Sequence, residues 1–192
     1  MRTGSLMRRS LFASIACVCF ALSLGACGLL APRQAFLTEP LQVAPAALGE
    51  RTVEQRLLIR WPGGERVMDA VLEITPEHLR LVMLAFGMRL ASLEYNGVTL
   101  TEQRFVPHAP EGKRILNDFL VIAAPLENLR RALPPGASVV ETFAEGKLRR
   151  EIFFDGVAKI VVDFETSSVW QGKVRFKNID GGYELILESH EI

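Results

Sequence analysis

Cys27 is the residue whose type and position most directly indicate a chemical modification. Together with the preceding Leu24, Gly25 and Ala26, it makes a four-residue pattern typical of a lipobox. A lipobox is the point at which a lipoprotein precursor is acylated and cut. The thiol takes a diacylglycerol, and the new amino group can take a third acyl chain after cleavage. One acyl chain holds a protein on a bilayer only marginally, whereas two or three, at roughly 0.8 kcal/mol per buried CH₂, hold it firmly. The sequence therefore predicts that Cys27 becomes a lipid-bearing N-terminus.

The residues before Cys27 have the order of a secretory signal peptide. A basic segment precedes an apolar run over residues 11–24, which is short of the roughly 20 residues that a membrane-spanning helix needs. We therefore predict a lipoprotein signal peptide over residues 1–26. The alternative is an ordinary secretory signal or an N-terminal membrane helix, with Cys27 there by chance. The basic residues are Arg2, Arg8 and Arg9, and they leave open the export route, general or twin-arginine, and a start at Met1 or Met7.

Length and composition predict one exported domain that has no disulfide. Removal of the 26 N-terminal residues from 192 leaves 166, enough for a single domain with its own core. Cys17 and Cys19 leave with the signal peptide, so acylation of Cys27 would remove the last free thiol. Three of the 22 basic residues leave as well, so that 19 remain against 22 acidic residues. This mild acidity, without a basic stripe, argues against nucleic acid as a partner.

Gly28 follows the predicted lipid-bearing cysteine. In Gram-negative bacteria an Asp at this position commonly retains a lipoprotein in the inner membrane, so Gly28 favours the periplasmic face of the outer membrane. Residues 27–50 are predicted to be a lipidated N-terminus and tether, which reaches roughly 25 Å. Part of this tether can instead pack on the domain, predicted over residues 51–192, as a short helix or an edge strand.

Alternation of apolar and polar residues predicts about ten β-strands after the tether. The first five, a meander, are 52–61, 65–74, 78–86, 88–95 and 98–105. The last five are 138–143, 148–154, 157–164, 169–178 and 183–189. Asn96-Gly97 and Asp155-Gly156 are typical of two-residue hairpin turns.

Between these two groups the apolar residues take helical spacing. A helix is predicted over residues 112–124, with Asn117 and Asp118 on its solvated side, and a shorter one over 126–133, which ends at prolines. A long antiparallel sheet tends to curl, and these helices are the segment available to cover its inner face. The predicted fold class is therefore mainly β with helices (α+β), a strongly curved antiparallel half-barrel of about ten strands covered by short helices.

This order of elements resembles that of the LolA and LolB proteins, the periplasmic carrier and outer-membrane receptor for bacterial lipoproteins. Residues 84–88 are similar to the apolar turn that LolB projects toward the membrane, and residues 124–130 with 133–136 are similar to its Pro-Leu-x-x-Leu-Arg helix and the stop after it. Residues 170–172 and 182–183 are typical of a LolB-like lipoprotein family often encoded beside aryl-polyene biosynthesis genes. The resemblance implies a LolA/LolB-type fold and a lipid-related role, without a proven substrate.

Inward-facing aliphatic and aromatic residues are candidates to line a cavity for acyl or polyene chains. A half-barrel covered by short helices is difficult to fill completely. The alternative is that the same residues are simply the core. The set comprises Trp61, Met68, Leu72, Leu81, Leu93, Tyr95, Phe119, Ile152, Phe154, Ile160, Phe164, Trp170 and Phe176.

Phe86 is the candidate tip for membrane insertion. The strand before it becomes apolar on both faces, and the chain then turns at Gly87. A large apolar side chain at a hairpin tip has no obvious core to enter. We therefore expect Phe86 either to dip into lipid or a partner, or to fold back under the helices.

No pattern in the sequence predicts a catalytic or metal site. The three histidines are far apart in the sequence, and there is no Gly-x-Ser-x-Gly turn or phosphate-binding glycine loop. We expect no cofactor and no enzymatic activity, although a lipid-modifying hydrolase with a site assembled in space remains an alternative. Arg149 and Arg150 are interpreted as an ordinary charged strand edge.

Together these features lead to a functional hypothesis. We expect a non-enzymatic outer-membrane lipoprotein that binds a hydrophobic cargo, either lipoprotein acyl chains or a polyene or fatty-acid-type lipid, and delivers it to the membrane. The expected partners are membrane lipid, this cargo and a LolA-like periplasmic carrier. The alternative is an anchored scaffold whose core is filled and which acts through surface contacts.

Overall fold

The computed structural model describes residues 36–192 except 108, 109 and 167. The predicted signal peptide, Cys27 and the first part of the tether lie outside the described residues. The rest belongs to one compact unit, Ala35–Ile192. Its strands are β1 (Arg51–Trp61), β2 (Gly64–Ile74), β3 (Leu79–Ala85), β4 (Met88–Tyr95), β5 (Leu100–Arg104), β6 (Ala137–Ala144), β7 (Lys147–Phe154), β8 (Val157–Phe164), β9 (Gly172–Asn178) and β10 (Tyr183–Glu191). Its helices are the 3₁₀ helix η2 (Pro45–Leu48), α2 (Gly112–Ala123) and α3 (Leu126–Ala132).

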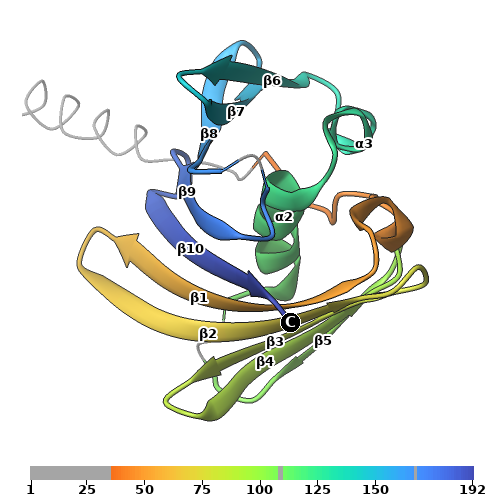
Figure 1. The fold of residues 1–192 in the computed structure, drawn as a ribbon, viewed down its shortest axis with the longest axis vertical. Helices are drawn as coiled ribbons and strands as arrows, with labels where there is room; N and C mark the ends of the chain where they lie inside the picture. Colours follow the sequence, from red (N-terminus) through yellow and green to blue (C-terminus); the bar gives the residue numbers. More distant parts are fainter. Residues whose placement is uncertain (1–35, 108–109, 167) are drawn as a thin grey trace, which may run out of the picture. The chain divides into compact units, whose positions relative to one another are not determined.

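All ten of these strands form one antiparallel sheet. Their order is β5-β4-β3-β2-β1-β10-β9-β8-β7-β6, so the chain makes two meanders that join where β1 pairs with β10. Figure 1 shows the sheet curving, with α2 lying over its concave face. Register shifts in the β3–β4 and β7–β8 pairs add local twist. The predicted α+β class, a curved antiparallel sheet of about ten strands covered by short helices, is confirmed.

The concave face of the sheet is buried and apolar, because apolar residues recur at every second position of its strands. In β2, residues Met68, Ala70, Leu72 and Ile74 are buried, while the residues between them are exposed. Strand β3 repeats the pattern, with Leu79, Leu81, Met83 and Ala85 buried. The concave face of the first meander thus presents rows of aliphatic side chains to α2.

Three hairpins turn through two residues with positive φ: Phe86-Gly87, Glu145-Gly146 and Asp155-Gly156. Asp155 and Gly156 have φ values of 49° and 74°, as expected for a two-residue turn of this type, and the prediction there is confirmed. The prediction for Asn96-Gly97 is wrong. The Asn96 side chain accepts hydrogen bonds from the backbone amides of Val98 and Thr99 instead, which makes a longer loop and delays β5 to Leu100.

The prediction that Asn117 and Asp118 face solvent is wrong. Both are buried in α2, because each has a polar partner from a distant segment. The Asn117 amide accepts a hydrogen bond from the backbone amide of Leu41 at 2.8 Å and donates one to the carbonyl of Glu39 at 2.9 Å. The Asp118 carboxyl group accepts one from the Tyr183 hydroxyl. The helix therefore has polar groups on its buried surface.

The second part of the predicted tether packs on the domain. Leu41, Val43 and Leu48 are buried in the main core, and η2 begins at Pro45. The Tyr95 hydroxyl donates a 2.6 Å hydrogen bond to the carbonyl of Leu41. This packing matches the alternative in which a short helix of the tether docks on the domain.

Arg150 is not part of a charged edge, and that interpretation is wrong. Its guanidinium is buried and donates to the carbonyls of Val121 and Ile122, at 2.6 and 3.1 Å, in the last turn of α2. It also pairs with Glu141 at 2.6 Å. Carbonyls in the last turn of a helix have no partner within the helix, and a cation there complements the helix dipole. Arg149 is the exposed member of the pair.

Candidate functional site

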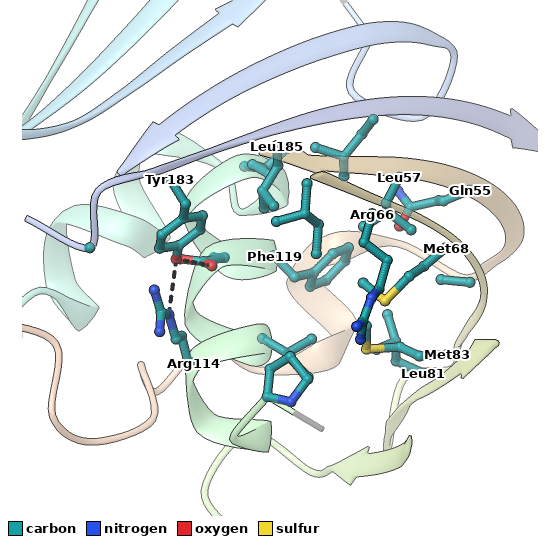
Figure 2. A pocket seen from close by; sticks show the side chains of 18 of the residues that line it. Gln55, Leu57, Arg66, Met68, Leu81, Met83, Arg114, Phe119, Tyr183 and Leu185 are labelled. Atoms are coloured by element: carbon teal, nitrogen blue, oxygen red, sulfur yellow. Dashed lines mark hydrogen bonds between the residues drawn. The ribbon is translucent and has the colours of Figure 1, made fainter. Parts of the chain in front are cut away.

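A pocket of about 500 Å³ lies between α2 and the concave face of the sheet. This volume falls within the roughly 300–1,000 Å³ typical of ligand pockets. Figure 2 shows sheet residues and α2 residues converging on the same space. The pocket is lined by Gln55, Leu57, Ile59, Trp61, Arg66, Met68, Ala70, Leu81, Met83, Pro110, Arg114, Ile115, Asp118, Phe119, Ile122, Gly181, Tyr183, Leu185 and Leu187.

Strand register brings the apolar lining residues into rows. Leu57 lies opposite Met68 on one side and Leu187 on the other, and Ile59 lies opposite Leu185. Because side chains at matching positions of an antiparallel pair point to the same face, each row presents a continuous apolar surface. Ile115, Phe119 and Ile122 of α2 close the space on the side opposite the sheet.

A polar network forms part of the pocket wall. The Tyr183 hydroxyl donates to Asp118 and accepts hydrogen bonds from Asn178 at 3.1 Å and from Arg114 at 3.3 Å. The Arg114 guanidinium also stacks 4.3 Å from the centre of the Tyr183 ring. The network thus ties the first residue of β10 to two residues of α2.

Burial changes the protonation of this network. Burial raises the pKa of Asp118 from 3.8 to about 7, against the opposing effect of the Tyr183 hydrogen bond. Burial and the adjacent Asp118 carboxyl raise the pKa of Tyr183. At neutral pH the Tyr183 phenol therefore stays protonated, and Asp118 lies near the midpoint of its titration.

Two further polar residues lie on the sheet side of the pocket. Gln55 is buried at the inner end of the pocket, and its side-chain amide donates a hydrogen bond to the Ser189 hydroxyl at 3.0 Å. Arg66 lies opposite Ile59 at the other end and is exposed. Trp61, also at this end, is 42% exposed, so the pocket reaches solvent beside Trp61 and Arg66.

Four of the thirteen predicted cavity residues line this pocket: Trp61, Met68, Leu81 and Phe119. Trp61 lies at the solvent-exposed end. Seven of the others are buried in the core outside the pocket lining: Leu72, Leu93, Tyr95, Ile152, Ile160, Phe164 and Phe176. The remaining two are half-buried, since Phe154 packs on Phe36 and Trp170 packs on Phe119. The predicted strand 169–178 begins only at Gly172, so Trp170 lies before it.

Sequence reasoning missed the polar members of the pocket. Gln55 and Arg66 occupy inward positions of β1 and β2, two residues from Leu57 and Met68, and strict alternation would have found them. Arg114 and Asp118 are four residues apart in the predicted helix, a spacing that places them on one side. Their contact with Tyr183 has no signal in the sequence.

Phe86 is 94% exposed at the turn between β3 and β4, with φ of 52°. The alternative in which it folds back under the helices is therefore wrong. Met88, two residues later, is 62% exposed. Phe86 and Met88 form an apolar hairpin tip, and neither residue belongs to the hydrophobic core cluster.

The model of the family described as "Protein of unknown function (DUF3261)" matches residues 52–191, which is well over half of the chain. The chain belongs to this family. The matched region runs from the first strand to the last, so the DUF3261 region of this chain contains every strand that lines the pocket. No curated protein has a sequence that matches this chain.

Solved structures match the chain at low similarity, and two of them show its level. A LolA superfamily protein, NE2245 from Nitrosomonas europaea, has a TM-score of 0.46 and 9% sequence identity, over 83% of this chain and 92% of that one. A DUF1329 family protein from Desulfovibrio piger ATCC 29098 has a TM-score of 0.40 and 6% identity, over 80% and 92% of the two chains. Because both scores are low, neither likeness supports a statement about function.

The pocket of this DUF3261 chain is walled mainly by apolar side chains. Its described lining includes no Ser, Thr, Cys or His, and the groups in it that could act as an acid or a base are Asp118 and Tyr183. Across the part of the chain that the structure describes, no three His, Cys, Asp or Glu residues gather as a metal site. Among the described helices, none combines the length and apolar character needed to cross a membrane.

Proposed function

We propose that this chain is a non-enzymatic binding protein that takes a hydrophobic cargo into the pocket beneath α2. The observation that carries the proposal is the 500 Å³ space itself, walled by aliphatic rows from β1, β2, β3 and β10. A domain whose core is filled by its own side chains would leave no such space. The pocket therefore favours cargo binding over the alternative of a scaffold with a filled core.

The driving force for binding is burial of apolar surface. An acyl or polyene chain gains about 25 cal/mol per Å² removed from water, whether the pocket or a bilayer covers it. The free energies of the two environments are then similar, so cargo can pass from one to the other without ATP at this step. Because area supplies most of this affinity, the pocket tolerates chains of different identity, such as lipoprotein acyl chains or polyene-type lipids.

We propose that the protein works as a lipoprotein anchored through acylated Cys27 to the periplasmic face of the outer membrane. The lipobox and Gly28 support this placement. The anchor would keep the pocket near the bilayer, and the exposed Phe86 tip would contact lipid during delivery. A LolA-like periplasmic carrier is the partner that would supply cargo. Mass spectrometry of membrane-extracted protein tests the anchor, since Cys27→Ser should abolish the acyl mass.

Filling the pocket tests the binding function. Ala70 is buried in the pocket lining, and Ala70→Phe places a ring in the space that cargo would occupy. The neighbouring Val71 points to the outer face and is 38% exposed, so Val71→Phe is a matched control. Titration of the full chain with a fluorescent palmitate analogue should show saturable binding that Ala70→Phe weakens more than tenfold and Val71→Phe leaves unchanged.

The N-terminal apolar run is the same in all three chains, so binding to that run cannot produce this difference. Circular dichroism and urea unfolding check that Ala70→Phe remains folded. Absence of saturable binding to the wild-type chain would overturn the proposal and favour the scaffold alternative.

A further inference from the structure

We infer that the cargo has an anionic head group, and that Arg66 binds this group at the open end of the pocket. The inference rests on the proposed function and deepens it by naming the class of cargo. That class is a long-chain amphiphile whose head is a carboxylate or a phosphate. The chain would lie along the aliphatic rows, and the head would stay in contact with water.

Arg66 points into the pocket rather than away from it. It occupies the same face of β2 as the buried residues Met68 and Ala70, and it lies opposite Ile59 of β1. Figure 2 shows its side chain extending among the lining residues. A cation at an inward position of an otherwise apolar strand face needs an explanation, because such positions are normally apolar.

No acidic group of the described residues pairs with Arg66. Two arginines of β1 point outward and have partners, since Arg56 pairs with Asp69 at 4.0 Å and Arg60 pairs with Glu65 at 3.1 Å. Glu65 precedes Arg66 directly, so it lies on the opposite face of the strand. The guanidinium of Arg66 thus remains available for an external anion.

The charges around the pocket are also suited to an anion. Two arginines, Arg66 and Arg114, line it against a single carboxyl group, Asp118. That carboxyl group accepts the hydrogen bond of the Tyr183 hydroxyl, and Arg114 donates to the same hydroxyl, so both groups are engaged within the wall. Among the described lining residues, Arg66 is then the charged group left for a ligand, and its charge favours an anion.

The position of Arg66 suits an amphiphile in particular. The pocket reaches solvent beside Arg66 and Trp61, while the rows from Met68 to Ala70 lead inward. An anionic head at this end keeps part of its hydration, so burial of the chain does not require burial of an uncompensated charge. A guanidinium can also donate two parallel hydrogen bonds to a carboxylate or a phosphate.

The test compares three ligands that each have 16 carbon atoms in their alkyl or acyl part and differ in the head group. Palmitate, hexadecyl phosphate and hexadecanol are used to displace the fluorescent analogue from the full chain at pH 8, each below the concentration at which it aggregates or precipitates. We expect at least one of the two anions to bind about five- to tenfold tighter than hexadecanol, as charge-assisted hydrogen bonds at a solvated site allow. The preferred anion distinguishes a carboxylate head from a phosphate head.

Three arginine variants decide whether Arg66 causes the preference for the anion. Arg66→Met should remove the preference for the anion and change hexadecanol binding less than twofold. Arg175→Met is the matched control, because Arg175 is also exposed and, among the described residues, also lacks an ion pair, yet it lies on the outward side of β9. Arg66→Lys keeps the charge and should retain part of the preference, which guards against an effect of folding alone.

The outcomes separate this inference from the proposed function. If none of the three ligands binds the wild-type chain, the proposed function itself fails. If hexadecanol binds as tightly as both anions, cargo binding stands and the anionic head group is refuted. If Arg66→Met weakens all three ligands equally, Arg66 acts through packing and the assignment is likewise refuted.

Discussion

The hydroxyl group of Tyr183 donates a hydrogen bond to the carboxyl group of Asp118, which lies 65 residues earlier in the chain. Tyr183 begins β10, and Asp118 lies in the middle of α2. Their bond therefore fixes the covering helix over the sheet at the wall of the pocket. Arg114 and Asn178 donate to the same tyrosine oxygen, so one phenol joins the helix, the end of β9 and the start of β10.

Asp118→Asn should remove a pH dependence of stability. Because burial raises the pKa of Asp118 to about 7 in the folded chain, the folded state binds a proton more tightly than the unfolded state does. This contribution to stability is full below about pH 4 and is lost as the pH rises through 7. Urea unfolding at pH 5 to 8 should show the free energy of unfolding falling with pH, and Asp118→Asn should flatten that slope.

The exposed Asp69 provides the control for this measurement, since Asp69→Asn should leave the slope of the wild-type chain unchanged. Equal slopes for the wild-type chain and Asp118→Asn would show that Asp118 is already ionised at pH 5.

Asn117→Ala should release the N-terminal strap, residues 39–43, from α2. The variant loses a buried hydrogen bond from the Leu41 amide and a part-buried one to the Glu39 carbonyl. We expect a loss of about 1–3 kcal/mol in the free energy of unfolding, because the buried Leu41 amide then lacks a partner. Hydrogen exchange should speed up most at the Leu41 amide. Unchanged protection of that amide would contradict the role assigned to Asn117.

Arg150→Met should destabilise the chain much more than Arg149→Met. The first change leaves Glu141 and the carbonyls of Val121 and Ile122 without their donor, whereas the second removes only exposed ion pairs. We expect about 2–3 kcal/mol for Arg150→Met, and less than about 0.5 kcal/mol for Arg149→Met. Urea unfolding of both variants checks this. Similar losses in the two variants would contradict the structural role of Arg150.

Phe86→Glu should leave folding intact and slow the release of cargo to membranes. Because Phe86 is 94% exposed, the substitution should change the free energy of unfolding by less than about 0.5 kcal/mol. A charge at the tip opposes contact with lipid, so transfer of the fluorescent palmitate analogue to vesicles should slow severalfold. Phe143→Glu, at another residue that is 69% exposed, should transfer like the wild-type chain. Equal rates in the two variants would remove the proposed role of the tip.

The sequence predicts the elements of this fold because its periodicities are strong. Alternation in β2 and β3 fixes which face of each strand is apolar, and the burial pattern follows it. Helical spacing predicts that α2 exists but not which residues it buries, because Asn117 and Asp118 on its predicted solvated side are buried. The Asp155-Gly156 turn also follows from local chemistry, since its residues accept positive φ. Asn96-Gly97 shows the limit of that rule, because the Asn96 side chain satisfies backbone amides in a longer loop.

The sequence by itself determined the apolar faces of the strands, the first meander and the presence of the helical cover. The lipobox at Cys27 stays a prediction. Only the tertiary structure decided which inward residues border empty space and which fill the core, because that depends on how closely α2 approaches each row of the sheet. It also decided the burial of Asp118 and Arg150, whose partners Tyr183, Val121 and Ile122 lie tens of residues away in the chain. Local patterns specify the direction of a side chain, whereas its partner is set by the packing of segments that are distant in sequence.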